Sequence, residues 1–159
     1  MRSTAQGPLA ADRTPGAPNT QLLTFAIGSE EYGLDILSVK KIRENTRTTP
    51  VPGIPACIRG LINFHGLIIP VMDLRVRLDL ERGEYSRFSV VIVVGAAGKT
   101  MGLLADSVVG VLEIPTGGLQ DAPARAGVRT PFIRAMAEDD QRLVIVLDVD
   151  EIVKLENTG

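Results

Sequence analysis

The segment Ser89–Ile114, SVVIVVGAAGKTMGLLADSVVGVLEI, contains three short apolar runs separated by turns. Residues 89–94 form a continuous run of the kind found in strands buried on both faces, and residues 100–105 and 108–114 are predicted to be two further strands. Residues 95–99 are predicted to be the first turn. Valine and isoleucine are frequent in these runs, and β-branched side chains favour pleated sheets. The segment therefore predicts a mostly β fold.

The N-terminal half of the chain follows a similar pattern. Residues 22–36 alternate apolar with polar or small side chains around a turn at residues 28–31, which predicts a β-hairpin. Residues 38–44 suit one helical turn or a twisted strand equally. Residues 48–55 contain three prolines and are predicted to form a rigid loop, because proline disfavours both helix interiors and central strands.

The middle of the chain is predicted to combine short helices with one strand. We expect a short helix at residues 56–63, followed by a strand at residues 67–72 that Pro70 places at a sheet edge or a bulge. Residues 73–82 are predicted to form another short helix, with Asp73 as its N-cap.

The C-terminal part is predicted to contain a connection, a hairpin and a helical turn. Residues 115–131 are rich in glycine and proline and read as a long connection. Residues 132–137 and 142–149 are the predicted strands of a final hairpin. Asp150 is expected to cap a short closing helix.

A weak internal repeat predicts a two-part architecture. Four residues recur at an offset of 69, with Gly33, Ser38, Val39 and Glu44 matching Gly102, Ser107, Val108 and Glu113. Such self-similarity indicates two copies of one small β unit. Two barrels of about five short strands each would bury their strand edges by closure. The predicted fold class is therefore mostly β, with two five-stranded barrels and short helices.

The chain is predicted to consist of a tail and one folded domain. Residues 1–20 contain three prolines and too little apolar material to order themselves, so a flexible tail is expected there. Residues 21–159 form the predicted domain. Its first barrel would span approximately residues 21–85 and its second residues 86–155, and whether the two intertwine is left open.

Composition restricts the classes of function. The net charge of −2 and the pI near 5.4 give no overall positive field to attract nucleic acid or anionic lipid. Cys57 is the only cysteine, which excludes an internal disulfide and a multi-cysteine metal site and favours a reducing cytoplasm. No apolar segment is long enough for the core of a signal peptide or for a membrane span. We expect a cytoplasmic protein without direct membrane insertion.

Two motifs suggest enzymes, and both have simpler interpretations. Residues 95–100, GAAGKT, end like a phosphate-binding loop, but Val93 stands where that loop needs its first glycine and no long helix follows. His65 is the only histidine, and no serine or cysteine occupies a nucleophile-elbow motif. We therefore expect no enzyme activity, no cofactor and no metal, with a P-loop nucleotide-binding protein as a less favoured alternative.

A basic patch is the remaining local signal. Lys40, Lys41, Arg43 and Arg47 lie close together in the sequence, where they suit a solvated charged face or an acidic partner. A nucleic-acid-binding β-barrel is a further alternative. It is disfavoured because such barrels stack bases on aromatic side chains, and only 4% of this chain is aromatic.

Four segments together resemble the CheW-like family of chemotaxis coupling proteins. They are EEYGLDILSVKKIRE, VPGIPACIRGLINFHGLIIPVMDLRVRL, VVIVVGAAGKTMGLLADSVVGVLEIP and FIRAMAEDDQRLVIVLDVDEIV, and residues 66–75 are the most specific piece. The resemblance spans roughly residues 22–155. It implies two SH3-like barrels that share a hydrophobic core. It also implies an adaptor that couples methyl-accepting receptors to the histidine kinase CheA in a bacterial signalling array.

The resemblance also implies partners and binding residues. The groove between the barrels would receive the cytoplasmic hairpin tip of a receptor, and the barrel ends would contact the regulatory domain of CheA. Carried over by position, the receptor groove comprises Val39, Lys41, Ile42, His65 and Val90, and the kinase-binding residues are Gly102 and Asp106. A monomer associated with receptor arrays at the inner membrane is expected. The coupler of a non-flagellar pathway, such as a type IV pilus system, is the alternative within the family.

This chain departs from the family pattern at two groove positions. Lys41 stands where an acid is usual, and His65 stands where an arginine is usual. A charge reversal at a docking surface normally requires a complementary partner, so we expect a dedicated receptor with an acidic or neutral residue facing Lys41. The charge of a histidine can change near neutrality, so His65 is expected to make docking sensitive to pH.

Overall fold

The structure is a computed structural model that describes residues 19–44, 47–81, 83, 85, 88–115, 117–121 and 130–155. The elements within these residues are, in chain order, β2 (Thr20–Ile27), β3 (Glu30–Asp35), the 3-10 turn η1 (Ile36–Ser38), β4 (Val39–Glu44), β5 (Ile58–Phe64), β6 (Leu67–Asp73), α1 (Leu74–Arg77), β7 (Val90–Ala96), β8 (Lys99–Ala105), β9 (Ser107–Ile114), β10 (Leu119–Gln120), η2 (Thr130–Phe132), β11 (Ile133–Asp139), β12 (Arg142–Leu147) and α2 (Val149–Val153).

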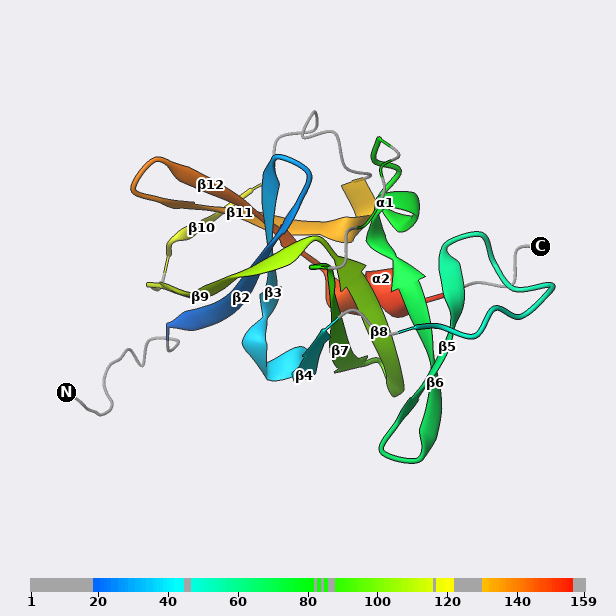
Figure 1. The fold of residues 1–159 in the computed structure, drawn as a ribbon. Helices are drawn as coiled ribbons and strands as arrows, with labels where there is room; N and C mark the ends of the chain where they lie inside the picture. Colours follow the sequence, from blue (N-terminus) through cyan, green and yellow to red (C-terminus); the bar gives the residue numbers. More distant parts are fainter. Residues whose placement is uncertain are drawn as a thin grey trace.

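The strands in the described part of the chain form two sheets (Figure 1). The six-stranded sheet has the order β10-β11-β12-β3-β2-β9, and the five-stranded sheet has the order β4-β7-β8-β6-β5. The predicted mostly β class with two small β units is therefore confirmed. The six-stranded sheet includes the two-residue β10, which lies in the segment predicted to be a plain connection. The predicted tail lies outside the described residues, except for its last two positions.

The two sheets are built in the same way and exchange strands. In the six-stranded sheet β3 pairs antiparallel with β2 and parallel with β12, and in the five-stranded sheet β8 pairs antiparallel with β7 and parallel with β6. After β3 the chain crosses to β4 in the other sheet, and after β8 it crosses back to β9. The repeated residues Gly33 and Gly102 occupy equivalent positions. Each sheet therefore contains strands from both sides of residue 85.

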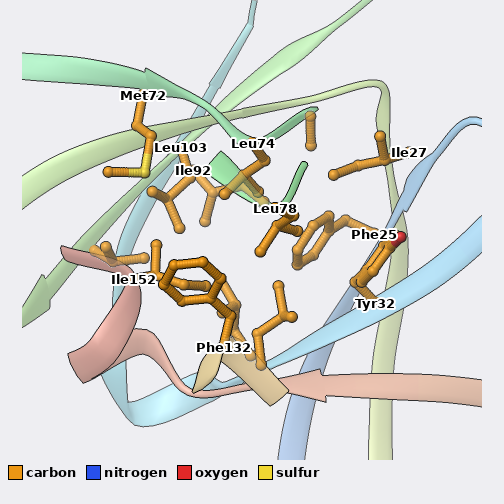
Figure 2. Close-up of a cluster of buried hydrophobic side chains, with 14 of the residues drawn as sticks. Phe25, Ile27, Tyr32, Met72, Leu74, Leu78, Ile92, Leu103, Phe132 and Ile152 are labelled. Carbon is orange, nitrogen blue, oxygen red and sulfur yellow. The ribbon is translucent and has the colours of Figure 1, made fainter. Parts of the chain in front are cut away.

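Buried side chains form three clusters. One fills the interior of the six-stranded sheet, one fills the interior of the five-stranded sheet, and the largest lies between them and receives side chains from both. Figure 2 shows this shared cluster, with Phe25 and Tyr32 from the six-stranded sheet near Leu74 of α1 and Leu78, which directly follows α1. Strands at the contact are consequently buried on both faces.

Strand β7 illustrates this double burial. Val91 and Val93 belong to the interior cluster of the five-stranded sheet, whereas Ile92 and Val94 belong to the shared cluster, and all four are fully buried. The continuous apolar run at residues 89–94 is therefore explained, because successive side chains of a strand point to opposite faces. The prediction of a strand buried on both faces is confirmed.

The predicted helix at residues 56–63 is wrong. Residues 58–64 form β5, which pairs antiparallel with β6 and contributes the buried residues Ile58, Gly60 and Ile62 from alternate positions. This period of two is the signature of a strand. Gly60 is required because a side chain there would collide with the Thr49 backbone, since its Cβ would lie 2.5 Å from that carbonyl oxygen.

Pro70 was expected at a sheet edge or a bulge, but β6 lies between β5 and β8. Opposite Pro70, the backbone N–H and C=O of Leu61 bond to Thr49, each at 2.9 Å, and therefore face away from β6. The proline nitrogen consequently points toward the other side, where pairing with β8 begins only at Val71. An inner strand accommodates the proline because no ladder hydrogen bond is lost.

Both short helices are capped by an aspartate at the end of a parallel-paired strand, with Asp73 as the last residue of β6 and Asp148 directly after β12. Asp73 accepts a hydrogen bond from the Arg75 amide at 2.9 Å, so its predicted capping role is confirmed, although α1 ends at Arg77. The predicted cap at Asp150 is wrong, because Asp148 accepts from the Glu151 amide at 3.2 Å and α2 starts at Val149. Segment 38–44, left open between helix and strand, is β4 after the end of η1.

The shared cluster predicts that two leucine-to-alanine substitutions differ strongly in their effect on stability. Leu103 is fully buried in this cluster, whereas Leu143 on β12 is 57% exposed. We expect Leu103→Ala to lower the free energy of unfolding by about 2–5 kcal/mol, because the substitution leaves a cavity. Leu143→Ala should change it by less than about 0.5 kcal/mol. Urea denaturation of both variants measures this, and equal effects would contradict the assignment of the core.

Candidate protein-binding surfaces

Strand β4 carries three of the five predicted receptor-groove residues at the edge of the five-stranded sheet. It pairs only with β7 in that sheet, with Lys41 opposite Val93 and Ile42 opposite Ile92. Val39 is half-buried and packs against the shared cluster, whereas Lys41 is exposed and Ile42 is 40% exposed. The strand therefore presents an apolar and a cationic side chain to solvent on a hydrogen-bonded support.

Three cations on β4 differ in their local partners. The Lys40 ammonium donates to the Thr100 hydroxyl at 3.1 Å, and the Arg43 guanidinium donates to the Asn63 carbonyl oxygen at 3.0 Å. Lys41 has no hydrogen bond or ion pair with any of the described residues. Of these side chains, Lys41 is thus the one available to pair with an acidic group on another molecule.

His65 lies at the turn between β5 and β6, next to the β4 edge. The turn has positive φ at His65 (53°) and Gly66 (84°), and the Asn63 side chain accepts from the Gly66 amide at 2.9 Å. The ring of Phe64 packs edge-on against His65 at 4.4 Å between centroids. Because Arg43 binds the Asn63 carbonyl, the base of this turn lies against β4. His65 itself is exposed.

Val90 differs from the other predicted groove residues. It begins β7, lies opposite Glu44 and packs half-buried against the shared cluster. The structure thus brings Val39, Lys41 and Ile42 together on one strand and places His65 beside that strand. Val90 lies at the far end of the β4–β7 ladder, where it contributes more to packing than to the exposed surface.

Positive charge is concentrated in the part of the chain that forms the five-stranded sheet. Residues 39–105 contain ten lysine and arginine side chains and five aspartate and glutamate side chains, although the whole chain has a net charge of −2. Local excess charge of one sign steers partners of the opposite sign. Strand β4 itself carries Lys40, Lys41 and Arg43 and a single acid, Glu44, so its surface suits an acidic partner.

Leu37 is an exposed apolar residue that sequence reasoning missed. It lies in η1 just before β4 and is 91% exposed, in a turn that Asp35 caps by accepting from the Leu37 amide at 3.0 Å. The sequence signal for this residue is the consecutive apolar pair Ile36–Leu37, which interrupts the alternation of apolar and polar residues in the preceding hairpin. Leu37 borders a hollow of about 430 Å³ at the junction of the two sheets, lined also by Asp35, Ser38, Gly95, Ala96, Arg134, Leu147, Asp148, Val149 and Asp150.

The two predicted kinase-binding residues are engaged inside the molecule. Gly102 is buried in β8, and a Cβ there would lie 2.7 Å from Cγ1 of Val91. Asp106 connects β8 with β9 and accepts hydrogen bonds from the Gly28 amide at 2.7 Å and from Arg75 at 2.8 Å. A direct contact with a partner through Gly102 would require β8 to open.

The segment that resembles a phosphate-binding loop is a β-hairpin turn. Residues 95–100 continue the antiparallel β7–β8 pair through a turn with positive φ at Ala97 and Gly98. Lys99 donates to the Val153 carbonyl oxygen at 3.3 Å, which ties this turn to α2. The N–H groups of such a turn do not form the helix-terminated phosphate cradle of a nucleotide-binding loop.

Other reactive groups are isolated within the described part of the chain. Burial raises the pKa of the Cys57 thiol, so this cysteine is protonated at neutral pH. No group of three or more histidine, cysteine, aspartate or glutamate side chains able to hold a metal occurs among the described residues. Among the same residues, no helix is both long and apolar enough to cross a membrane.

Comparison with known proteins identifies the family. The CheW-like domain model matches residues 21–157, so this chain belongs to the CheW-like family. Chemotaxis protein CheW of Klebsiella aerogenes is 31% identical over 137 residues, covering 86% of this chain and 82% of that protein. Protein PilI of Pseudomonas aeruginosa is 28% identical over 119 residues, covering 74% of this chain and 66% of that protein.

A solved structure supports the same assignment. The crystal structure of the scaffolding protein TtCheW from Thermoanaerobacter tengcongensis superimposes with a TM-score of 0.82 at 29% sequence identity. The match covers 89% of this chain and 97% of that chain. The two-sheet architecture is therefore that of the family.

The burial of Gly102 predicts a stability effect that a surface residue would not show. Gly102→Ala places a Cβ 2.7 Å from Val91 and should lower the free energy of unfolding by about 1–3 kcal/mol through overpacking. Gly110→Ala is the matched control, because nothing lies within 4 Å of a Cβ at that position on β9. Thermal or urea unfolding compares the two. A neutral Gly102→Ala would show that this part of β8 is open.

Proposed function

We propose that this protein is a chemotaxis adaptor that couples methyl-accepting receptors to a CheA-type histidine kinase. The observation that carries the proposal is the exposed edge strand β4, where Ile42 and Lys41, which has no hydrogen bond or ion pair with any described residue, project from successive positions near the turn that holds His65. Membership of the CheW-like family supports the same function. Function then depends on surfaces that hold other proteins, with no bond made or broken.

The composition of the β4 surface fits a protein partner. Specific interfaces combine an apolar centre with a polar or charged rim, and here Ile42 supplies apolar area while Lys41 and His65 supply polar groups. The β4–β7 ladder and the packing of Val39 fix the backbone beneath these side chains. Such preorganisation reduces the entropy lost on binding. A helical receptor hairpin with an acidic tip is the partner that this surface suits.

The remaining parts of the proposal concern the kinase and the cellular setting. The end of the sheets near Gly102 and Asp106 would bind the regulatory domain of the kinase, so that receptor and kinase occupy separate surfaces. The protein would act as a cytoplasmic monomer recruited to receptor arrays at the inner membrane, without cofactor or nucleic acid. Its signal would be transmitted as a change in the packing of its partners.

A second candidate is the coupler of a non-flagellar pathway, such as a type IV pilus system. The likeness to Protein PilI favours keeping this candidate, although that match covers less of both chains than the match to the Klebsiella aerogenes protein. Purification of the native protein with its bound kinase and receptor distinguishes the two, because each system has its own kinase. Recovery of neither a kinase nor a receptor would contradict the adaptor proposal.

Receptor choice tests the role of Lys41. We expect Lys41→Glu to reverse the preference among receptor tips of different charge, shifting relative affinity by about tenfold, because like charges across an interface repel. Lys40→Glu is the matched control, since it makes the same charge change on the adjacent residue, whose ammonium binds Thr100. Titration of several receptor tips against the three proteins measures the effect. An unchanged preference in Lys41→Glu refutes the role of Lys41.

The pH dependence of receptor binding tests the role of His65. Histidine is the residue whose charge changes near neutrality, so a contact of the exposed His65 with an acidic receptor tip predicts tighter binding at pH 6 than at pH 8. His65→Asn should abolish this difference while leaving the fold intact, because the side chain is exposed and asparagine tolerates the positive φ of 53°. Calorimetry at the two pH values measures both proteins. Equal wild-type affinities would rule out a contact through His65.

A further inference from the structure

Asp106 lies at the point where the chain crosses from the five-stranded to the six-stranded sheet. Its backbone N–H donates to the Ala26 carbonyl oxygen at 3.0 Å, and its Oδ2 accepts from the Gly28 amide at 2.7 Å. Both partners belong to the region of the β2–β3 turn. Oδ2 also accepts from Nη2 of Arg75 at 2.8 Å, which follows strand β6 in α1. One carboxylate therefore joins elements of both sheets.

Arg75 is held in place from several directions. Its guanidinium lies 5.3 Å from the centre of the Tyr85 ring, and Nη1 donates to the Glu81 carbonyl oxygen at 3.4 Å. The Tyr85 hydroxyl in turn donates to Asp73 at 2.6 Å, and Asp73 accepts from the Arg75 amide. The approach to Gly83 is so close that a Cβ there would lie 2.8 Å from Nη1. The guanidinium has little room for another position.

The Arg75 guanidinium forms its ion pair with Asp106 although one of its N–H groups lacks a hydrogen-bond partner among the described residues. Nε of Arg75 is buried and has no hydrogen-bond partner among the described residues, which costs free energy. The side chains of Arg75 and Asp106 are only 14% and 28% exposed. A charge pair that is largely removed from water is strongly destabilised when one partner is lost. We call Asp106, Arg75 and the Gly28 amide the crossover latch.

We infer that Asp106 is a positioning residue for kinase binding, which acts by locking the β2–β3 turn against α1 through the crossover latch. This inference rests on the proposed function. Residues 28–30 of the turn and Val76 of α1 are exposed beside the latch, whereas the Asp106 carboxylate is occupied. The kinase domain would contact the locked turn and helix, and the carboxylate would determine their relative position.

The test uses Asp106→Asn, Arg75→Met and the double variant. Arg75→Lys is added as a fourth variant because it keeps the positive charge and the aliphatic stem, and it replaces Arg75→Met if that variant folds poorly. Asp79→Asn is the matched control, because it removes one exposed negative charge near α1 at a positive φ of 61° that asparagine tolerates. Two quantities are measured in the full-length protein. They are the hydrogen-exchange rate of the Gly28 amide and the affinity for the regulatory domain of the kinase.

We expect each latch variant to raise the Gly28 exchange rate and to weaken kinase binding, both by about tenfold, with the double variant close to the single ones because the residues act as a unit. The control should match the wild type in both measurements. A loss of affinity in Asp106→Asn but not in the Arg75 variants would overturn the inference, because it would make Asp106 a direct contact.

Failure of the proposed function gives a different result. If wild-type protein does not bind the kinase domain, the adaptor proposal fails and so does the positioning role, but Gly28 exchange still reports whether the crossover latch exists. If the wild type binds and Gly28 exchange is unchanged in all latch variants, the crossover latch is refuted while the adaptor proposal stands.

Discussion

The structure depends on burial of the strands where the two sheets meet. Each central strand has to present apolar side chains to the interior of its own sheet and to the shared cluster, as Val91 and Ile92 do from successive positions of β7. Few polar residues are tolerated in such strands, because an unpaired polar group buried between the sheets would be costly. Thr24 meets this requirement by donating from its hydroxyl to the Gly110 carbonyl oxygen at 3.1 Å.

The surfaces proposed for binding lie where this burial ends. Strand β4 is anchored to β7 on one side, so its exposed side chains project from a backbone that cannot readily shift. The polar groups of the crossover latch sit at the margin of the shared cluster, where Arg77 likewise donates to the Ile152 carbonyl oxygen at 3.0 Å and ties α1 to α2. Such ties fix the spacing between elements of the two sheets, and with it the distance between the surfaces proposed for the receptor and the kinase.

Much of the fold was predictable from local pattern, and the exceptions have identifiable causes. Continuous and alternating apolar runs located most of the strands, and the weak repeat correctly indicated two similar β units. The helix prediction for β5 is wrong because Gly60, at a buried position of this strand, has no apolar side chain and so hides the apolar–polar alternation. Glycine is needed there because of the close contact with the Thr49 backbone. The groove residues came from family resemblance. The latch could not be found, since Asp106 lies 78 residues from Gly28 and 31 from Arg75 in sequence.

The exchange of strands between the sheets has a consequence for biosynthesis. Strand β2 pairs with β9, where Thr20 lies opposite Ile114. Strand β3 pairs with β12, where Glu31 lies opposite Val144, so its partner is synthesised much later. Pairing between residues so distant in sequence slows folding, because much of the chain has to be ordered before the contacts form. The strands of the five-stranded sheet end at Ala105, but the six-stranded sheet cannot be completed until β12 has left the ribosome. The early hairpin therefore emerges with unprotected edges, and molecular chaperones are the natural safeguard during that interval.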